Sequence, residues 1–95
     1  MHIEKELRKA IRIARKHGVG KLYLVGSTLH SRKPAPRDFD FAVAGVPSGA
    51  FFKFYGELIV ALSLPVDLIN LSGKQTKLKR LVLQEAVLLY DKNAA

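Results

Sequence analysis

The segment from Asp38 to Ala44 alternates acidic or small side chains with large apolar ones. Successive side chains of a β-strand point to opposite faces, so this alternation predicts a strand over 39–44. Phe39, Phe41 and Val43 would then lie together on one buried face. Asp38 and Asp40 would share the opposite face with Cβ atoms about 7 Å apart. Whatever sheet this chain builds is therefore expected to carry two neighbouring carboxylates.

Hydrophobic periodicity predicts three helices and three further strands around this segment. The helices are expected at 2–17, from about Ser48 as N-cap to Leu62, and from the capping-box pair Ser72 and Gln75 to about Ala86. The other strands are expected at 21–25, 66–71 and 87–90. The residues predicted to face inward are Ile3, Leu7, Ala10, Ile11 and Ala14 in the first helix, Phe51, Phe52, Tyr55, Leu58, Ile59 and Leu62 in the second, and Leu78, Leu81 and Val82 in the third.

The order of these elements favours a small α/β (α+β) domain over 1–95. We expect a mixed sheet of three to four strands with the helices packed on one face. The connection between strands 21–25 and 39–44 is too short for a full crossover helix, so these strands should pair antiparallel. A doubly wound parallel sheet does not fit this order.

Composition excludes several kinds of site and location. The 95 residues contain no cysteine, which rules out disulfides, thiolate zinc sites and a cysteine nucleophile. No apolar run approaches the roughly 20 residues that cross a bilayer. The N-terminal residues are charged every few positions, unlike a signal peptide. We therefore expect a cytoplasmic protein with no membrane partner.

The formal net charge of +8 indicates a polyanionic partner, although a soluble lysine-rich surface would give the same sum. The acids are few, and Asp38, Asp40 and Asp67 lie inside or beside apolar segments. Each acid alone is consistent with an exposed strand end. Together they predict a cluster, if the strand carrying Asp67 lies beside 39–44.

Clustered carboxylates repel one another by roughly 2 kcal/mol per pair at an effective dielectric near 20. Either one acid stays protonated, or a cation offsets the charge. Mg²⁺ prefers oxygen ligands, takes few carboxylates and leaves room for phosphate oxygens. Three carboxylates suffice for two metal ions about 4 Å apart.

Gly26 and Ser27 end the first predicted strand, where backbone amides and a hydroxyl can bind phosphate oxygens. Gly26-Ser27, ten intervening residues and then Asp38-Phe39-Asp40 resemble the G-S-x10-D-x-D signature of the DNA polymerase β-like nucleotidyltransferase superfamily. Asp67 falls where that superfamily carries its third aspartate. The short chain and its ending over 81–90 are similar to the minimal nucleotidyltransferases (MNT).

The resemblance implies a reaction and a role for each motif residue. Gly26 and Ser27 would hold the β- and γ-phosphates of a nucleoside triphosphate. Asp38 and Asp40 would ligate two Mg²⁺ ions, with Mn²⁺ as a substitute. Asp67 would ligate the catalytic ion and help to deprotonate the acceptor hydroxyl. The enzyme would move a nucleoside monophosphate to that hydroxyl and release pyrophosphate.

The loop after Ser27 departs from the family pattern. His30 stands where an arginine is common and is a candidate nucleotide-binding residue, with an exposed loop histidine as the alternative. Arg37 replaces a common serine and, with Arg32 and Lys33, would neutralise phosphates. A solvated loop is the competing interpretation of these cations.

The resemblance also implies a partner, because many MNT proteins pair with a helical HEPN-domain protein as a toxin–antitoxin system. Some transfer AMP from ATP onto a tyrosine of that partner. Two other functions stay open: a catalytically inactive antitoxin or interaction module, and a small basic nucleic-acid-binding protein. For the latter, the candidate surface is the basic face of the first helix, which consists of Lys5, Arg8, Lys9, Arg12, Arg15 and Lys16. This face could instead be exposed to solvent or contact an acidic protein.

Overall fold

The computed structural model describes residues 3–25, 38–74 and 76–94. Within them the chain forms, in order, α1 (Ile3–Lys16), β1 (Lys21–Val25), β2 (Phe39–Ala44), α3 (Phe51–Ala61), β3 (Val66–Asn70), α4 (Lys77–Glu85) and β4 (Val87–Asp91). The strands make one four-stranded sheet in the order β3-β2-β1-β4. β1 is antiparallel to both β2 and β4, and β2 is parallel to β3. The predicted α+β class and the antiparallel pairing of the first two strands are confirmed.

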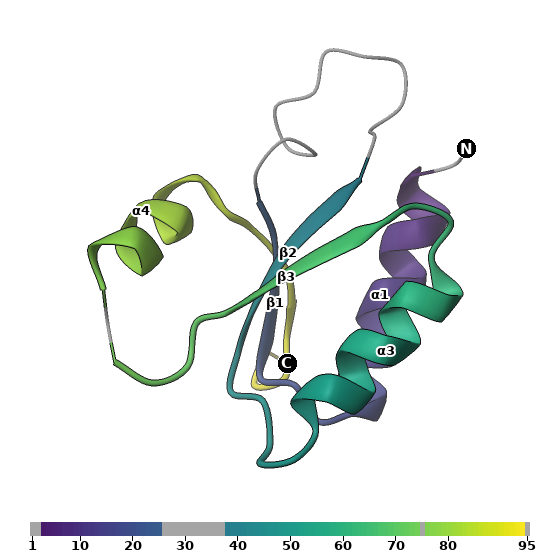
Figure 1. The fold of residues 1–95 in the computed structure, drawn as a ribbon, viewed down its shortest axis with the longest axis horizontal. Coiled ribbons are helices and arrows are strands. Elements are labelled where there is room, and N and C mark those ends of the chain that lie inside the picture. The colour runs from purple at the N-terminus through teal and green to yellow at the C-terminus, as the bar shows by residue number, and fades with distance from the viewer. Residues whose placement is uncertain (1–2, 26–37, 75, 95) are drawn as a thin grey trace.

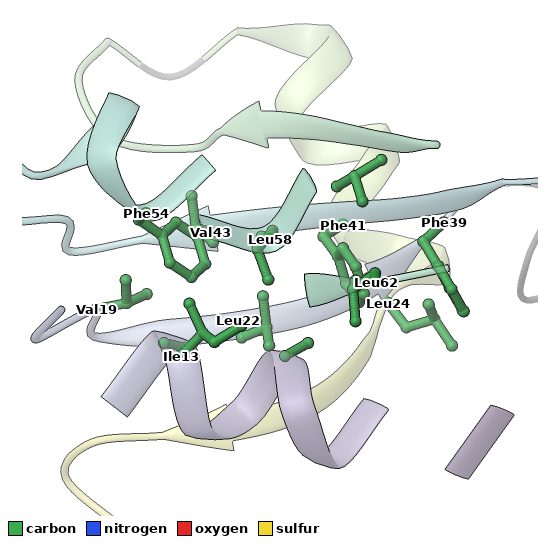
Figure 2. Packing of buried hydrophobic residues seen from close by; sticks show 13 residues of the cluster. Ile13, Val19, Leu22, Leu24, Phe39, Phe41, Val43, Phe54, Leu58 and Leu62 are labelled. Carbon is green, nitrogen blue, oxygen red and sulfur yellow. The ribbon is translucent and has the colours of Figure 1, made fainter. Parts of the chain in front are cut away.

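α1 and α3 cover one face of the sheet (Figure 1). The alternation in β2 turns Phe39, Phe41 and Val43 toward these helices, and none of the three side chains is accessible to solvent. Figure 2 shows Leu22 of β1 and Leu58 of α3 in the same layer. This face is the main hydrophobic core, and it holds β2 rigidly along its length.

The parallel pairing of β3 with β2 follows from the connection between them. α3 forms the crossover that parallel neighbours require, and the register sets Asp40 opposite Asp67. Tyr55 of α3 donates a hydrogen bond of 2.9 Å to the carbonyl oxygen of Val66, which ties the helix to the start of β3. The packing of α3 on the core side of the sheet and the register of β3 against β2 thus place Asp67 beside Asp40.

α4 lies on the other side of the sheet from α1 and α3 (Figure 1). Its Val82, with the following Ala86, packs against a second, smaller cluster of Val25, Ala42 and Leu71. The prediction that all helices pack on one face of the sheet is therefore correct for α1 and α3 and wrong for α4. No helix in the described part of the chain is long and apolar enough to cross a bilayer.

The predicted inward face of α3 is correct in part, since Leu58 and the following Leu62 are buried and Phe51 and Tyr55 pack against the core. Its buried residues are Phe54 and Leu58, whereas Phe52 is 83% exposed and Ile59 is 55% exposed. The predicted N-cap was also wrong: the helix begins after Ala50, which makes no side-chain cap, rather than at Ser48. Apolar residues surround almost the whole helix, so periodicity alone cannot select the buried stripe.

α4 starts later than its predicted capping box. Thr76 is the N-cap, and its hydroxyl accepts a hydrogen bond of 3.1 Å from the backbone of Lys79. Ser72 instead accepts a hydrogen bond from the Gly45 amide at 3.1 Å, and Gln75 lies outside the described residues. Leu78 and Leu81, predicted to face inward, are 69% and 52% exposed. α4 is held to the sheet by few contacts and buries no residue fully.

Candidate active site

Three carboxylates meet on the sheet face that carries α4. Asp40 and Asp67 are paired across the parallel strands β2 and β3, and Asp38 precedes β2 by one residue. Because side chains two apart on a strand share a face, Asp38 and Asp40 both point away from the main core. One side-chain oxygen from each of the three residues lies within 4.8 Å of the other two.

This cluster has the charge and donor chemistry of a divalent-cation site. Asp38 and Asp40 are partly buried, and Asp67 is exposed. At 4.8 Å, two carboxylates repel by about 3 kcal/mol at an effective dielectric near 20. A hard cation with oxygen ligands offsets this repulsion, and Mg²⁺ accepts two or three carboxylates while retaining positions for water and phosphate. The donor set therefore fits Mg²⁺.

A cavity of about 290 Å³ opens beside the carboxylates, between the sheet and α4. Asp40 and Asp67 lie on its polar side. The remaining lining is largely apolar and comes from the sheet and α4: Val25, Ile69, Leu81 and Val82, together with the acid Glu85; Phe41, whose side chain packs in the main core, also borders it. A hollow that combines an apolar wall with convergent carboxylates is typical of a small-molecule site.

Sequence reasoning missed the contribution of α4 to this cavity. Glu85 reaches the same hollow as Asp40 and Asp67, yet the sequence analysis used 81–90 only as a point of resemblance. Two features of the sequence could have indicated these cavity-lining residues. Ile69 follows Asp67 by two residues on one strand, and Glu85 follows Leu81 by four on one helix, so each pair shares a face.

The predicted phosphate-binding residues Gly26, Ser27, His30 and Arg37 lie outside the described residues, as do Arg32 and Lys33. Their roles stay predictions. The described neighbour of this segment is Val25, the last residue of β1, which is paired with Asp40 and lines the cavity. Gly26 therefore follows directly, in sequence, the β1 residue beside the carboxylates.

Comparison with known proteins agrees with this geometry. The sequence model of a family described as polymerase beta, nucleotidyltransferase, matches residues 8–95. A toxin–antitoxin complex solved with AMP-PNP contains a chain that is 25% identical, with a TM-score of 0.72 over 92% of this chain and 74% of that one.

Two further solved structures share the fold at lower identity. One is the complex of a tri-AMPylated Shewanella oneidensis HEPN toxin with its MNT antitoxin, with 24% identity, a TM-score of 0.70 and coverage of 94% of this chain and 72% of that chain. The other is described as a minimal nucleotidyltransferase, with 22% identity, a TM-score of 0.67 and coverage of 90% of both chains. No curated protein matches the sequence.

Proposed function

Because this chain belongs to the polymerase β family of nucleotidyltransferases, we propose that it transfers a nucleoside monophosphate from a nucleoside triphosphate to a hydroxyl group, in a Mg²⁺-dependent reaction. One observation carries the proposal: the side-chain oxygens of Asp38, Asp40 and Asp67 converge within 4.8 Å beside a cavity. A hard cation offsets the mutual repulsion of carboxylates placed this closely, and Mg²⁺, which such oxygen ligands favour, is also the ion that binds triphosphates.

In this reaction the acceptor oxygen forms a bond to the α-phosphorus, and the bond between the α- and β-phosphates breaks. Pyrophosphate is the leaving group, and the hydroxyl proton passes to a carboxylate or to water. When bound, Mg²⁺ (two ions, replaceable by Mn²⁺) would act as a Lewis acid toward phosphate oxygens. Phosphoryl chemistry of this kind depends mainly on positioning and charge, and Asp40 and Asp67 are positioned by their pairing across the strands β2 and β3.

Each residue of the site has a proposed task. Asp40 on β2 and Asp38 directly before it, both partly buried, would hold the metal ions. Asp67 is the exposed member of the cluster, so it is the acid best placed to orient an incoming hydroxyl and accept its proton. Gly26 and Ser27 would donate hydrogen bonds to the phosphates. His30 and Arg37 would offset phosphate charge.

We propose further that the acceptor hydroxyl belongs to a partner protein. The domain over 1–95 supplies the donor side of the reaction, and an acceptor on another chain completes it. Solved structures with this fold include an MNT antitoxin bound to an AMPylated HEPN toxin. A HEPN-type partner in the cytoplasm, with this chain as the antitoxin-like half and ATP as donor, is therefore the first pairing to test.

The test is transfer of label from α-labelled ATP, CTP, GTP or UTP to a purified HEPN-domain partner in the presence of Mg²⁺. We expect one nucleotide to label the partner, and expect Asp40→Asn and Asp67→Asn each to reduce the rate at least 100-fold. Asp91→Asn on β4 is the matched control, because it makes the same chemical change in an acid that accepts a hydrogen bond from the Asn93 amide rather than joining the cluster.

Two results would count against the proposal. If transfer survives both Asp40→Asn and Asp67→Asn, these two carboxylates are not part of the active site. Partner binding with neither transfer nor pyrophosphate release for any nucleotide would make the chain a catalytically inactive interaction module.

A further inference from the structure

The solvent-facing side of α1 carries six cations and no acid between them. At 100° per residue these cations fall within an arc of about 120°, opposite the buried residues Ala10 and Ala14. The acids of α1 lie outside this arc, with Glu4 at its edge and Glu6 on the buried side. We call the set the basic stripe: Lys5, Arg8, Lys9, Arg12, Arg15 and Lys16.

Within the described residues, two of these six charges are paired with an acid. Lys9 pairs with Glu6 at 3.1 Å, and Lys16 pairs with Glu57 of α3 at 3.0 Å. The Arg15 guanidinium lies 5.7 Å from the centroid of the Tyr90 ring, a contact that orients the side chain without cancelling its charge. No ion pair to Arg8 or Arg12 is found among the described residues, and both side chains are exposed.

This arrangement is unfavourable for an isolated helix. Like charges three and four residues apart, such as Arg8 with Arg12 and Arg12 with Lys16, repel on one face. A helix that needs only solubility relieves this repulsion by alternating acids with bases. The basic stripe has no such alternation, and a polyanion bound from outside would relieve the repulsion that its ion pairs with Glu6 and Glu57 leave.

Two hollows border Arg12, one along α1 and one, which the acid Glu57 also lines, between α1 and α3. A hollow of about 320 Å³ lies along α1 and is lined by Arg8, Ile11, Arg12 and Arg15. A groove of about 370 Å³ follows the seam between α1 and α3, and Arg12 lines this groove too. Guanidinium groups bind phosphates in a bidentate, planar manner, so adjacent arginines over hollows are well suited to a row of phosphates.

We propose that the basic stripe binds the sugar–phosphate backbone of a nucleic-acid duplex. From Lys5 to Lys16 the stripe is about 16 Å long, which corresponds to about five base-pair steps of 3.4 Å. It contains no aromatic side chain on which single-stranded bases could stack. It also lacks the apolar centre of a stable protein–protein interface, and this disfavours an acidic protein as the occupant.

The basic stripe lies on α1 and the carboxylates lie on the side of α4, and these two helices are on opposite sides of the sheet (Figure 1). A duplex on α1 therefore does not compete with a nucleoside triphosphate at Asp38, Asp40 and Asp67. Nucleic-acid binding by the basic stripe is therefore independent of the transfer reaction, and the two proposals are tested separately.

The test is fluorescence anisotropy of labelled DNA and RNA duplexes of about 20 base pairs, several times the span of the stripe, titrated with the full chain in EDTA at increasing salt. The triple variant Arg8→Gln, Arg12→Gln, Arg15→Gln should bind at least tenfold more weakly. Its slope of log affinity against log salt should fall by about 2 to 3, since each lost phosphate contact on B-DNA contributes about 0.9. The control triple Lys53→Gln, Lys77→Gln, Arg80→Gln removes the same charge elsewhere and should change affinity less than threefold.

Circular dichroism of both triples checks that α1 is intact. If the triple variant of the basic stripe loses helical structure, the single variant Arg12→Gln is tested instead. Its affinity for the duplexes should fall threefold, and its slope of log affinity against log salt should fall by about 1. Equal effects of the two triples would overturn the proposal, as would the absence of binding at low salt. Displacement of the duplexes by poly-glutamate at equal charge concentration would do so too, in favour of an acidic protein partner.

Discussion

Glu6 joins α1 to the turn between α3 and β3, and its replacement by glutamine gives a measurable test of the packing. The Glu6 carboxylate accepts hydrogen bonds from both the hydroxyl and the backbone amide of Ser63, the latter at 2.7 Å. Its other oxygen lies 3.1 Å from Lys9 Nζ. The Ser63 hydroxyl, then the Ser63 amide and Lys9, lower the pKa of Glu6 from 4.5 to about 2, against an opposing effect of burial.

The size of the effect follows from this shift. The interval between 4.5 and about 2 corresponds to about 3 kcal/mol at 1.36 kcal/mol per pH unit. Solvent screening of Lys9, and the hydrogen bonds that glutamine still accepts, reduce the expected loss to about 1–2 kcal/mol. Because the folded-state pKa is depressed, the stabilisation is complete above pH 4.5 and disappears as the pH falls toward 2.

The assay is urea unfolding of the wild type, Glu6→Gln and Glu4→Gln at several pH values between 7 and 2.5. Glu6→Gln should be less stable by about 1–2 kcal/mol at pH 7, and the difference should shrink below pH 4.5. Glu4→Gln makes the same change at an exposed position in the first turn of α1 and should cost only a few tenths of a kcal/mol. A Glu6→Gln curve that matches wild type at pH 7, or a difference that does not depend on pH, would refute the reasoning.

Three further changes, one of them with a control variant, test other parts of the fold. Phe41→Ala empties a fully buried position and should lower the free energy of unfolding by about 3–5 kcal/mol in urea, whereas Phe52→Ala, 83% exposed, should change it by less than about 0.5. Tyr55→Phe removes the 2.9 Å hydrogen bond to the Val66 carbonyl and should cost about 1 kcal/mol by the same measurement. Thr76→Ala removes the N-cap of α4 and should speed amide hydrogen exchange in that helix with little change in the main core. Core amides that exchange faster by the same factor would contradict a local effect.

The strands were the most predictable part of this fold. The sequence predicts β1 and β2 with the bounds that the structure has, because period-two alternation is a local signal and the short connection forces antiparallel pairing. It also places Asp38 and Asp40 on the face away from Phe39 and Phe41. The convergence of Asp67 on them depends on strand order, which no local pattern encodes, and its expected position came from the family resemblance.

The helices were less predictable, for physical reasons specific to each. In α3 the only charged residues are Lys53 and Glu57, and apolar residues occupy most of the circumference, so the period does not distinguish Phe52 from Phe54. Before α4 both Ser72 and Thr76 are possible N-caps. The Ser72 hydroxyl accepts a hydrogen bond from the Gly45 amide, and Thr76 caps the helix. The sequence analysis also missed Leu81 and Glu85 as cavity-lining residues, because the side of the sheet that α4 covers depends on tertiary contacts that local patterns do not specify.

The most direct test of the account compares ATP labelled at the α-phosphate with ATP labelled at the γ-phosphate, in a single turnover with Mg²⁺ and a HEPN-domain partner. If Asp38, Asp40 and Asp67 support nucleotidyl transfer, the α-label appears on the partner and the γ-label leaves as pyrophosphate, and both signals disappear in Asp67→Asn. A γ-label on the partner would instead mean phosphoryl transfer. That result, or release of inorganic phosphate without any labelled partner, would contradict the central claim.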